Sequence, residues 1–176
     1  MDKSKKIIIG IVSSIVGLFL LLNIFWISYR EIRYKPLTQG FEDVYGIPEK
    51  RVDDVEYNVF KPGYLGFGGN LTVHVTSTKY VSKSGKSFDV DKDDGLIIWP
   101  SFPSGYEYAA CIEIEKSYDP KTKQYVSNSA VIVIDENGEW ADTSSNFGKK
   151  HKEAFEKKKP FIKELLKDTK EFWNLD

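Results

Sequence analysis

The chain has 176 residues, of which 41% are hydrophobic and 29% are charged, and its formal net charge is −1. This composition predicts one folded domain with room for an appendage. A chain so close to neutral lacks the basic excess of general nucleic-acid-binding proteins, so we expect no nucleic-acid partner. One cysteine and two histidines exclude a disulfide scaffold and a cysteine-rich metal site, and leave little material for histidine-based catalysis.

The first predicted element is a membrane-spanning helix over residues 7–29, a run without any charged side chain. About 20 such residues cross a hydrocarbon core of roughly 30 Å as a helix. Trp26 and Tyr29 close the run, and amphipathic rings favour the headgroup level. Bulky Tyr29 and charged Arg30 occupy the place where signal-peptide cleavage needs small residues, so we expect an uncleaved anchor.

The basic residues that flank this helix are equal in number on its two sides, so their count does not determine its orientation. Three basic residues lie on each side of the run, Lys3, Lys5 and Lys6 before it and Arg30, Arg33 and Lys35 after it. The free amino terminus and the short leading segment favour a cytoplasmic tail over residues 1–6. We therefore expect a single-pass protein of the cell membrane, with residues 30–176 forming an extracytoplasmic domain.

The remaining chain predicts an α+β domain. Residues 30–35 are expected to form a charged stalk and residues 38–45 a short helix closed by Gly46 and Pro48. Strand-like alternation or short apolar runs follow over 55–60, 70–80, 96–99, 106–115 and 126–134. From residue 149 the apolar spacing becomes helical, with one helix expected before Pro160 and one after it. An antiparallel sheet covered on one face by carboxy-terminal helices accounts for this order.

The clearest alternation, over residues 106–115, supplies the candidate binding residues. Tyr106, Tyr108, Ala110, Ile112 and Ile114 form one face, and Glu107, Ala109, Cys111, Glu113 and Glu115 form the other. If the tyrosine and isoleucine face enters the core, Glu107, Glu113 and Glu115 point outward together and could bind a cationic protein partner. The alternative is a solvated face that only discourages edge pairing.

Other motifs give no specific chemistry. The acidic run 89–95 has the D-x-D-x-D spacing of a calcium loop, but Asp94 stands at the glycine position and Pro100 at the closing glutamate position, so we expect a solvated turn. The glycine-rich run 63–69 lacks a phosphate-loop lysine and precedes a strand, so we expect a simple turn. Glutamates beside Cys111 disfavour a reactive thiolate. We therefore expect a non-enzyme without metal or cofactor.

Two segments carry a resemblance to a known family. The closing sequence TKEFWNL (169–175) and the stretch AVIVIDENGEWADTSS (130–145), together with the amino-terminal anchor, are similar to the TipC family of immunity proteins of Gram-positive bacteria. The resemblance covers mainly residues 41–46 and 130–176. It implies a protein displayed outside the cell that binds and neutralises a secreted LXG-type toxin attacking cell-wall precursors.

A second function also suits this sequence. The strand and turn over residues 131–138 fit a PepSY-like extracytoplasmic module that binds or regulates a cell-wall enzyme or a sensor system. Both functions describe a membrane-anchored protein that acts by binding another protein.

Overall fold

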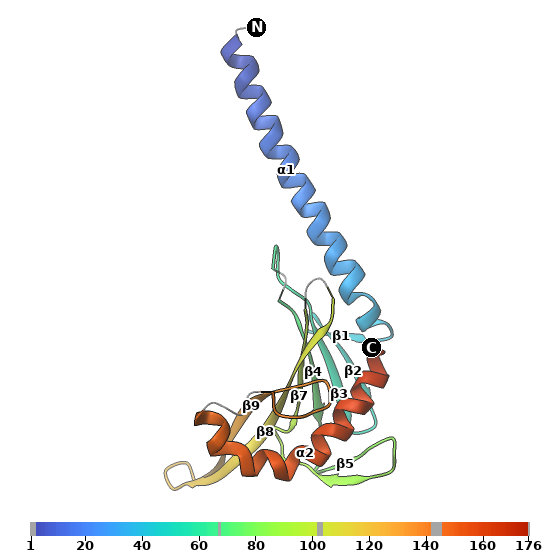
Figure 1. The fold of residues 1–176 in the computed structure, drawn as a ribbon, viewed down its shortest axis with the longest axis vertical. Helices are drawn as coiled ribbons and strands as arrows, with labels where there is room; N and C mark the ends of the chain where they lie inside the picture. Colours follow the sequence, from blue (N-terminus) through green and yellow to red (C-terminus); the bar gives the residue numbers. More distant parts are fainter. Residues whose placement is uncertain (1–2, 67, 102–103, 142–145, 176) are drawn as a thin grey trace.

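The computed structural model describes residues 3–66, 68–101, 104–141 and 146–175 (Figure 1). Two long helices frame a set of strands. The elements are α1 (Lys3–Tyr34), η1 (Pro36–Thr38), β1 (Glu42–Val44), β2 (Ile47–Val52), β3 (Val55–Phe60), β4 (Asn70–Val75), β5 (Lys79–Val81), β6 (Ser87–Asp89), β7 (Gly95–Pro100), β8 (Tyr106–Asp119), β9 (Gln124–Ile134) and α2 (Asn146–Trp173).

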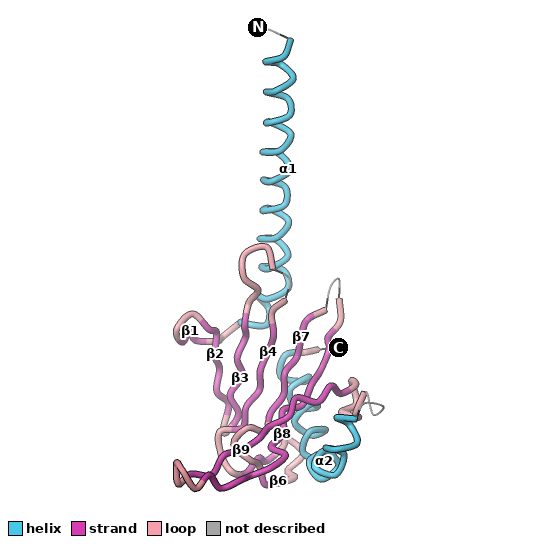
Figure 2. Tube along the Cα trace, turned by 90° about the vertical axis from the view of Figure 1, so that its left-hand side faces the viewer, coloured by secondary structure: helices cyan, strands magenta, loops and turns pink. Residues whose placement is uncertain are grey.

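The strands confirm the α+β prediction. Seven of them form one antiparallel sheet in the order β1-β2-β3-β4-β7-β8-β9, and β5 and β6 form a separate hairpin inserted between β4 and β7. Helix α2 packs on one face of the sheet, and α1 projects away from it (Figures 1 and 2). Since every neighbouring pair is antiparallel, no crossover helix is needed, and the longer connection from β4 to β7 carries the β5–β6 hairpin.

The core lies between the sheet and α2. Strand alternation places one set of apolar side chains under the helix, namely Val59, Leu71, Val73, Leu96, Ile98, Ala110, Ile112 and Ile132. The helix contributes Phe155, Phe161, Ile162, Leu165 and Leu166. These buried positions confirm the inward face predicted for β8 and the apolar stripe predicted for the carboxy-terminal segment.

Helix α2 differs from its prediction because it continues through Pro160. A proline inside a helix removes one backbone hydrogen bond and crowds the preceding turn, which bends the helix. In Figure 1 the two halves of α2 run in different directions. The bend is compatible with the core because residues on both sides of Pro160, Phe155 and Phe161, are buried.

The predicted short helix over residues 38–45 is wrong, since β1 and β2 form a hairpin there. Tyr45 and Gly46 join the strands and both have positive φ angles, 53° and 85°. Such a pair is typical of the two-residue turns whose twist suits antiparallel strands. Only η1 keeps a helical turn, at Pro36–Thr38.

The predicted stalk is also wrong, because α1 continues without a break into the domain. Tyr34 at its end is completely buried and Leu37 is nearly so. Trp173, at the end of α2, donates a hydrogen bond from Nε1 to the Leu37 carbonyl over 3.0 Å. The base of α1 is therefore part of the folded core, while the rest of the helix is long and apolar enough to span a membrane.

Candidate partner-binding surface

The three predicted glutamates share β8 but not one surface. Glu107 is exposed at the start of β8, where its carboxylate accepts a hydrogen bond from Ser101 Oγ over 3.1 Å. Glu113 and Glu115 lie six and eight residues further on, about 20 Å or more along an extended strand. A single compact acidic patch is therefore absent from β8.

A β-bulge also separates Glu113 from Glu115. Glu113 pairs with Ser129, but Glu115 pairs with Asn128, the next residue of β9. Neighbouring residues of a strand point to opposite faces, so the bulge turns Glu115 away from the face of Glu113. The expectation that all three carboxylates point outward together is wrong for this reason.

Glu113 is largely occupied by contacts within the domain. Its side chain is only 8% exposed and lies 3.6 Å from Lys116 Nζ. Ser127 Oγ donates a hydrogen bond to its other oxygen over 2.5 Å. A carboxylate in this position stabilises the β8–β9 hairpin and has little surface to offer a partner.

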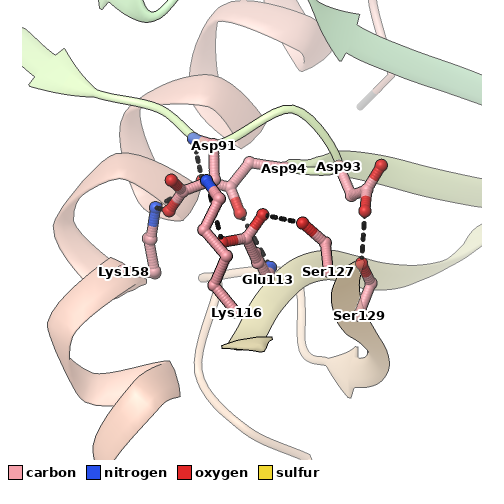
Figure 3. A network of polar contacts seen from close by, with 8 residues as sticks. All are labelled: Asp91, Asp93, Asp94, Glu113, Lys116, Ser127, Ser129 and Lys158. Atoms are coloured by element: carbon pink, nitrogen blue, oxygen red, sulfur yellow. Dashed lines mark hydrogen bonds and ion pairs between the residues drawn. The ribbon is translucent and has the colours of Figure 1, made fainter. Parts of the chain in front are cut away.

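Glu113 belongs to a polar network that ties α2 to the sheet (Figure 3). At its centre Lys158 Nζ lies 2.5 Å from Asp91 Oδ2 and 2.6 Å from Asp94 Oδ2. Asp94 is completely buried, and it also accepts hydrogen bonds from the backbone N–H groups of Asp91 and Glu113. Its carboxylate is therefore matched by one cation and two backbone donors.

The charges in this network stabilise each other. The hydrogen bond from Lys158 lowers the pKa of Asp91. Burial alone would lower the pKa of Lys158, but the hydrogen bonds to Asp91 and Asp94 outweigh it and the pKa of Lys158 is raised. Both effects favour the ionised pair at neutral pH.

This arrangement explains the acidic run 89–95. The expectation of a solvated turn is wrong for Asp94, which is buried, while the side chain of Asp91 is 39% exposed. Asp93 turns away and accepts a hydrogen bond from Ser129 Oγ over 2.7 Å. Within the described parts of the chain, no group of three or more acidic, histidine or cysteine side chains could hold a metal ion.

Cys111 is a poor nucleophile in this fold. It lies on β8, half buried, and burial raises its pKa, as do the charges of Asp93 and Asp94. The sequence also disfavours a thiolate here, but in the structure the charges come from Asp93 and Asp94 and not from the β8 glutamates. His74 lies on β4 and His151 on α2.

The face of the sheet opposite α2 offers a more extended surface. The pairing register places Arg51, Glu56, His74, Cys111 and Val131 in one row across the strands. Asn58, Thr72, Ile97, Ala109 and Val133 form the next row. The β2–β4 half of this face is polar, whereas the β7–β9 half combines apolar side chains with Glu107 and Glu113.

The apolar part of the β7–β9 half, which we call the valine edge, consists of Ile97, Trp99, Val131 and Val133. Val131 and Val133 are 52% and 54% exposed, although valine at alternating strand positions normally faces a core. They lie on β9, the last strand of the sheet. In the described chain only Trp140 and Ala141 pair with its outer edge, at Ile134 and Val133.

The sequence contains a signal for this surface, and it lies in β9 rather than in β8. In the run AVIVI (130–134) every residue is apolar, which is typical of a strand covered on both faces. The structure covers one of these faces with α2, where Ala130, Ile132 and Ile134 are buried. The exposed valines therefore remain available to a partner.

Comparison of the chain with protein-family models, with curated proteins and with solved structures finds no match.

Proposed function

We propose that this protein is a membrane-anchored, extracytoplasmic binding protein that neutralises a secreted LXG-type toxin. The observation that carries the binding role is the valine edge, an exposed apolar stripe on β9, whose outer edge is paired only at Val133 and Ile134 within the described residues. Partners recognise such edges by adding a strand, with main-chain hydrogen bonds for affinity and side-chain contacts for specificity. The toxin as the partner comes from the resemblance of residues 130–176 to TipC immunity proteins.

The arrangement of the chain supports this role. Helix α1 supplies the anchor, and its base is built into the core through Tyr34 and Leu37. The β8–β9 hairpin extends away from α1 at the far end of the domain (Figure 1). With α1 in the membrane, the hairpin and much of β9 stand clear of the bilayer, where they can reach a soluble protein.

The test is binding of the full-length protein, in detergent or nanodiscs, to a purified LXG-type toxin encoded by the same genome. We expect tight binding and survival of toxin-exposed cells that produce the protein. Val131→Lys with Val133→Lys should weaken binding at least tenfold, since two charges replace apolar contacts. The matched control is Val81→Lys on β5, where the wild-type valine is 65% exposed on a different element.

Each result decides one part of the proposal. If the double variant and Val81→Lys both bind the toxin as tightly as the wild type, the binding surface does not lie at the valine edge. Absence of binding and of protection for every such toxin would overturn the immunity function. Capture of a cell-wall enzyme or sensor protein instead would favour the PepSY-like regulatory function.

A further inference from the structure

The loop between β3 and β4 reaches back along α1, towards the segment expected in the membrane (Figure 2). Tyr64 donates a hydrogen bond to Asn23 Oδ1 over 2.5 Å, and its ring lies edge-on to Trp26 with centroids 5.3 Å apart. Trp26 donates a hydrogen bond from Nε1 to the Gly66 carbonyl over 2.9 Å. The residue as a whole is only 6% exposed. The loop therefore covers one side of α1 near the end of the uncharged run.

The length of α1 places this contact inside the bilayer. From Ile7, the first residue of the uncharged run, to Asn23 the helix rises about 24 Å, which is less than the roughly 30 Å hydrocarbon core. From Asn23 to Arg30, the first charge after the run, it rises about 10 Å, whereas each headgroup layer is only about 5–8 Å thick. Asn23, and with it Tyr64, then lies at or within the boundary of the acyl chains.

The hydrogen bonds of Asn23 and Trp26 suit an environment without water. An amide in hydrocarbon needs partners for both of its polar atoms. Asn23 Nδ2 donates to the Phe19 carbonyl over 2.8 Å, and Asn23 Oδ1 accepts from Tyr64. The indole N–H of Trp26 likewise donates to the loop, so Asn23 and Trp26 make these hydrogen bonds within the protein and without water.

The tip of the loop is apolar, although its side chains are exposed and lie outside the core of the domain. Residues 62–70 carry no charge. Tyr64 and Leu65 are 60% and 45% exposed, and Leu65 has a φ of 55°, a conformation that favours glycine. Neither burial in the core nor backbone preference explains a leucine at this position, but contact with lipid does.

We propose that the β3–β4 loop inserts its tip, Tyr64 and Leu65, into the outer leaflet of the membrane and so fixes the domain against the lipid surface. This inference rests on α1 being the membrane anchor of the proposed function. Tyrosine suits the interface because its ring is apolar and its hydroxyl finds a partner. Together with the buried base of α1, the inserted loop holds the sheet in one orientation relative to the bilayer.

The test measures the depth of an environment-sensitive fluorophore on the full chain in lipid vesicles, in a Cys111→Ser background. The dye NBD is attached at Leu65→Cys, and quenching by lipids with doxyl groups on their acyl chains is recorded. Leu18→Cys in the middle of α1 is the membrane reference, and Val81→Cys on β5 is the solvent reference. We expect the dye at Leu65 to be blue-shifted and quenched, at a shallower depth than the dye at Leu18, and the dye at Val81 to be neither blue-shifted nor quenched.

The reference positions separate the two possible failures. A quenched Leu18 with an unquenched Leu65 that matches Val81 overturns loop insertion and leaves the anchor standing. An unquenched Leu18 overturns the anchor and the insertion with it. If Leu65→Cys does not fold, the dye at Tyr64→Cys reads the same depth, and the same two outcomes apply.

Discussion

Lys158 on α2 and Asp94 in the β6–β7 connection form an ion pair of 2.6 Å in which the carboxylate is completely buried and the lysine side chain is 12% exposed. The two residues are separated by 64 positions along the chain. Their contact joins the helix to the sheet at the point where β8 begins to bulge (Figure 3). This pair is consequently a sensitive point for the stability of the whole domain.

Replacing Lys158 with methionine should destabilise the protein by about 3–5 kcal/mol, because the buried carboxylate of Asp94 loses its counter-charge. Chemical denaturation of the detergent-solubilised protein measures the change. The double variant Lys158→Met with Asp94→Asn should be less destabilised than the sum of the single variants, since it removes the unpaired charge as well.

The matched control for this variant is Lys163→Met on the same helix. Lys163 Nζ also lies 2.6 Å from a carboxylate, that of Glu139, but both side chains are 42% exposed. An exposed ion pair contributes little to stability because water and salt screen it, so the control should be nearly neutral. Equal losses for the two lysine variants would show that burial of Asp94 does not matter.

Acid should destabilise the protein partly through Asp91. Its pKa is lowered below the ordinary 3.8 by the hydrogen bond from Lys158. A carboxyl group with a lowered folded-state pKa stabilises the fold above its unfolded pKa, and this stability is lost as the pH falls through the folded pKa. Stability measured from pH 6 downward should therefore fall less steeply below about pH 4 in Asp91→Asn than in the wild type.

The same titration in a Lys158→Met background provides the control. Without the ammonium group the cause of the shift is gone, so Asp91→Asn should then change the slope very little. A large effect of Asp91→Asn in that background would assign the acid sensitivity to another interaction.

The stability of the domain should also depend on the absence of a side chain at Gly95, for steric reasons. A Cβ atom at Gly95 would lie 2.2 Å from the Val73 carbonyl oxygen, a contact with rigid sheet backbone. Gly95→Ala should destabilise the domain by about 1–3 kcal/mol or more through overpacking. Gly63→Ala, where nothing lies within 4 Å, should leave the melting temperature almost unchanged. Equal melting temperatures for both variants would contradict this close approach of β4 and β7.

Local patterns predicted much of this fold. The strand over residues 55–60 has the predicted bounds, and Leu71, Val73 and Val75 alternate into the core as expected. These elements follow from hydrophobic periodicity, which acts over a few residues. The hairpin at Tyr45–Gly46 escaped prediction because a three-residue strand has almost no periodicity to detect.

The errors at the candidate site have a different physical origin. The bulge after Glu113 depends on how β8 pairs with β9, and the burial of Asp94 depends on Lys158 from a distant helix. Neither relationship is encoded in the spacing within one strand. Pro160 was expected to separate two helices because local rules favour a break, but the packing of Phe155 and Phe161 on its two sides favours one bent helix.

The remaining glutamates of β8 keep a testable role in attracting a partner. Charges at the rim of an interface act mainly on association, because their field extends beyond contact distance, by about 30 Å at 0.01 M salt. Glu107 and Glu115 are exposed and can act in this way, whereas Glu113 is held by Lys116 and Ser127. We expect Glu107→Lys with Glu115→Lys to slow association with the proposed toxin partner several-fold at low salt. Dissociation should be unchanged, and the difference in association rate should shrink as salt is added.

Stopped-flow mixing at several salt concentrations measures these rates, and circular dichroism verifies the fold of the variant. An association rate equal to that of the wild type at 0.01 M salt would show that the two carboxylates are only solvated surface.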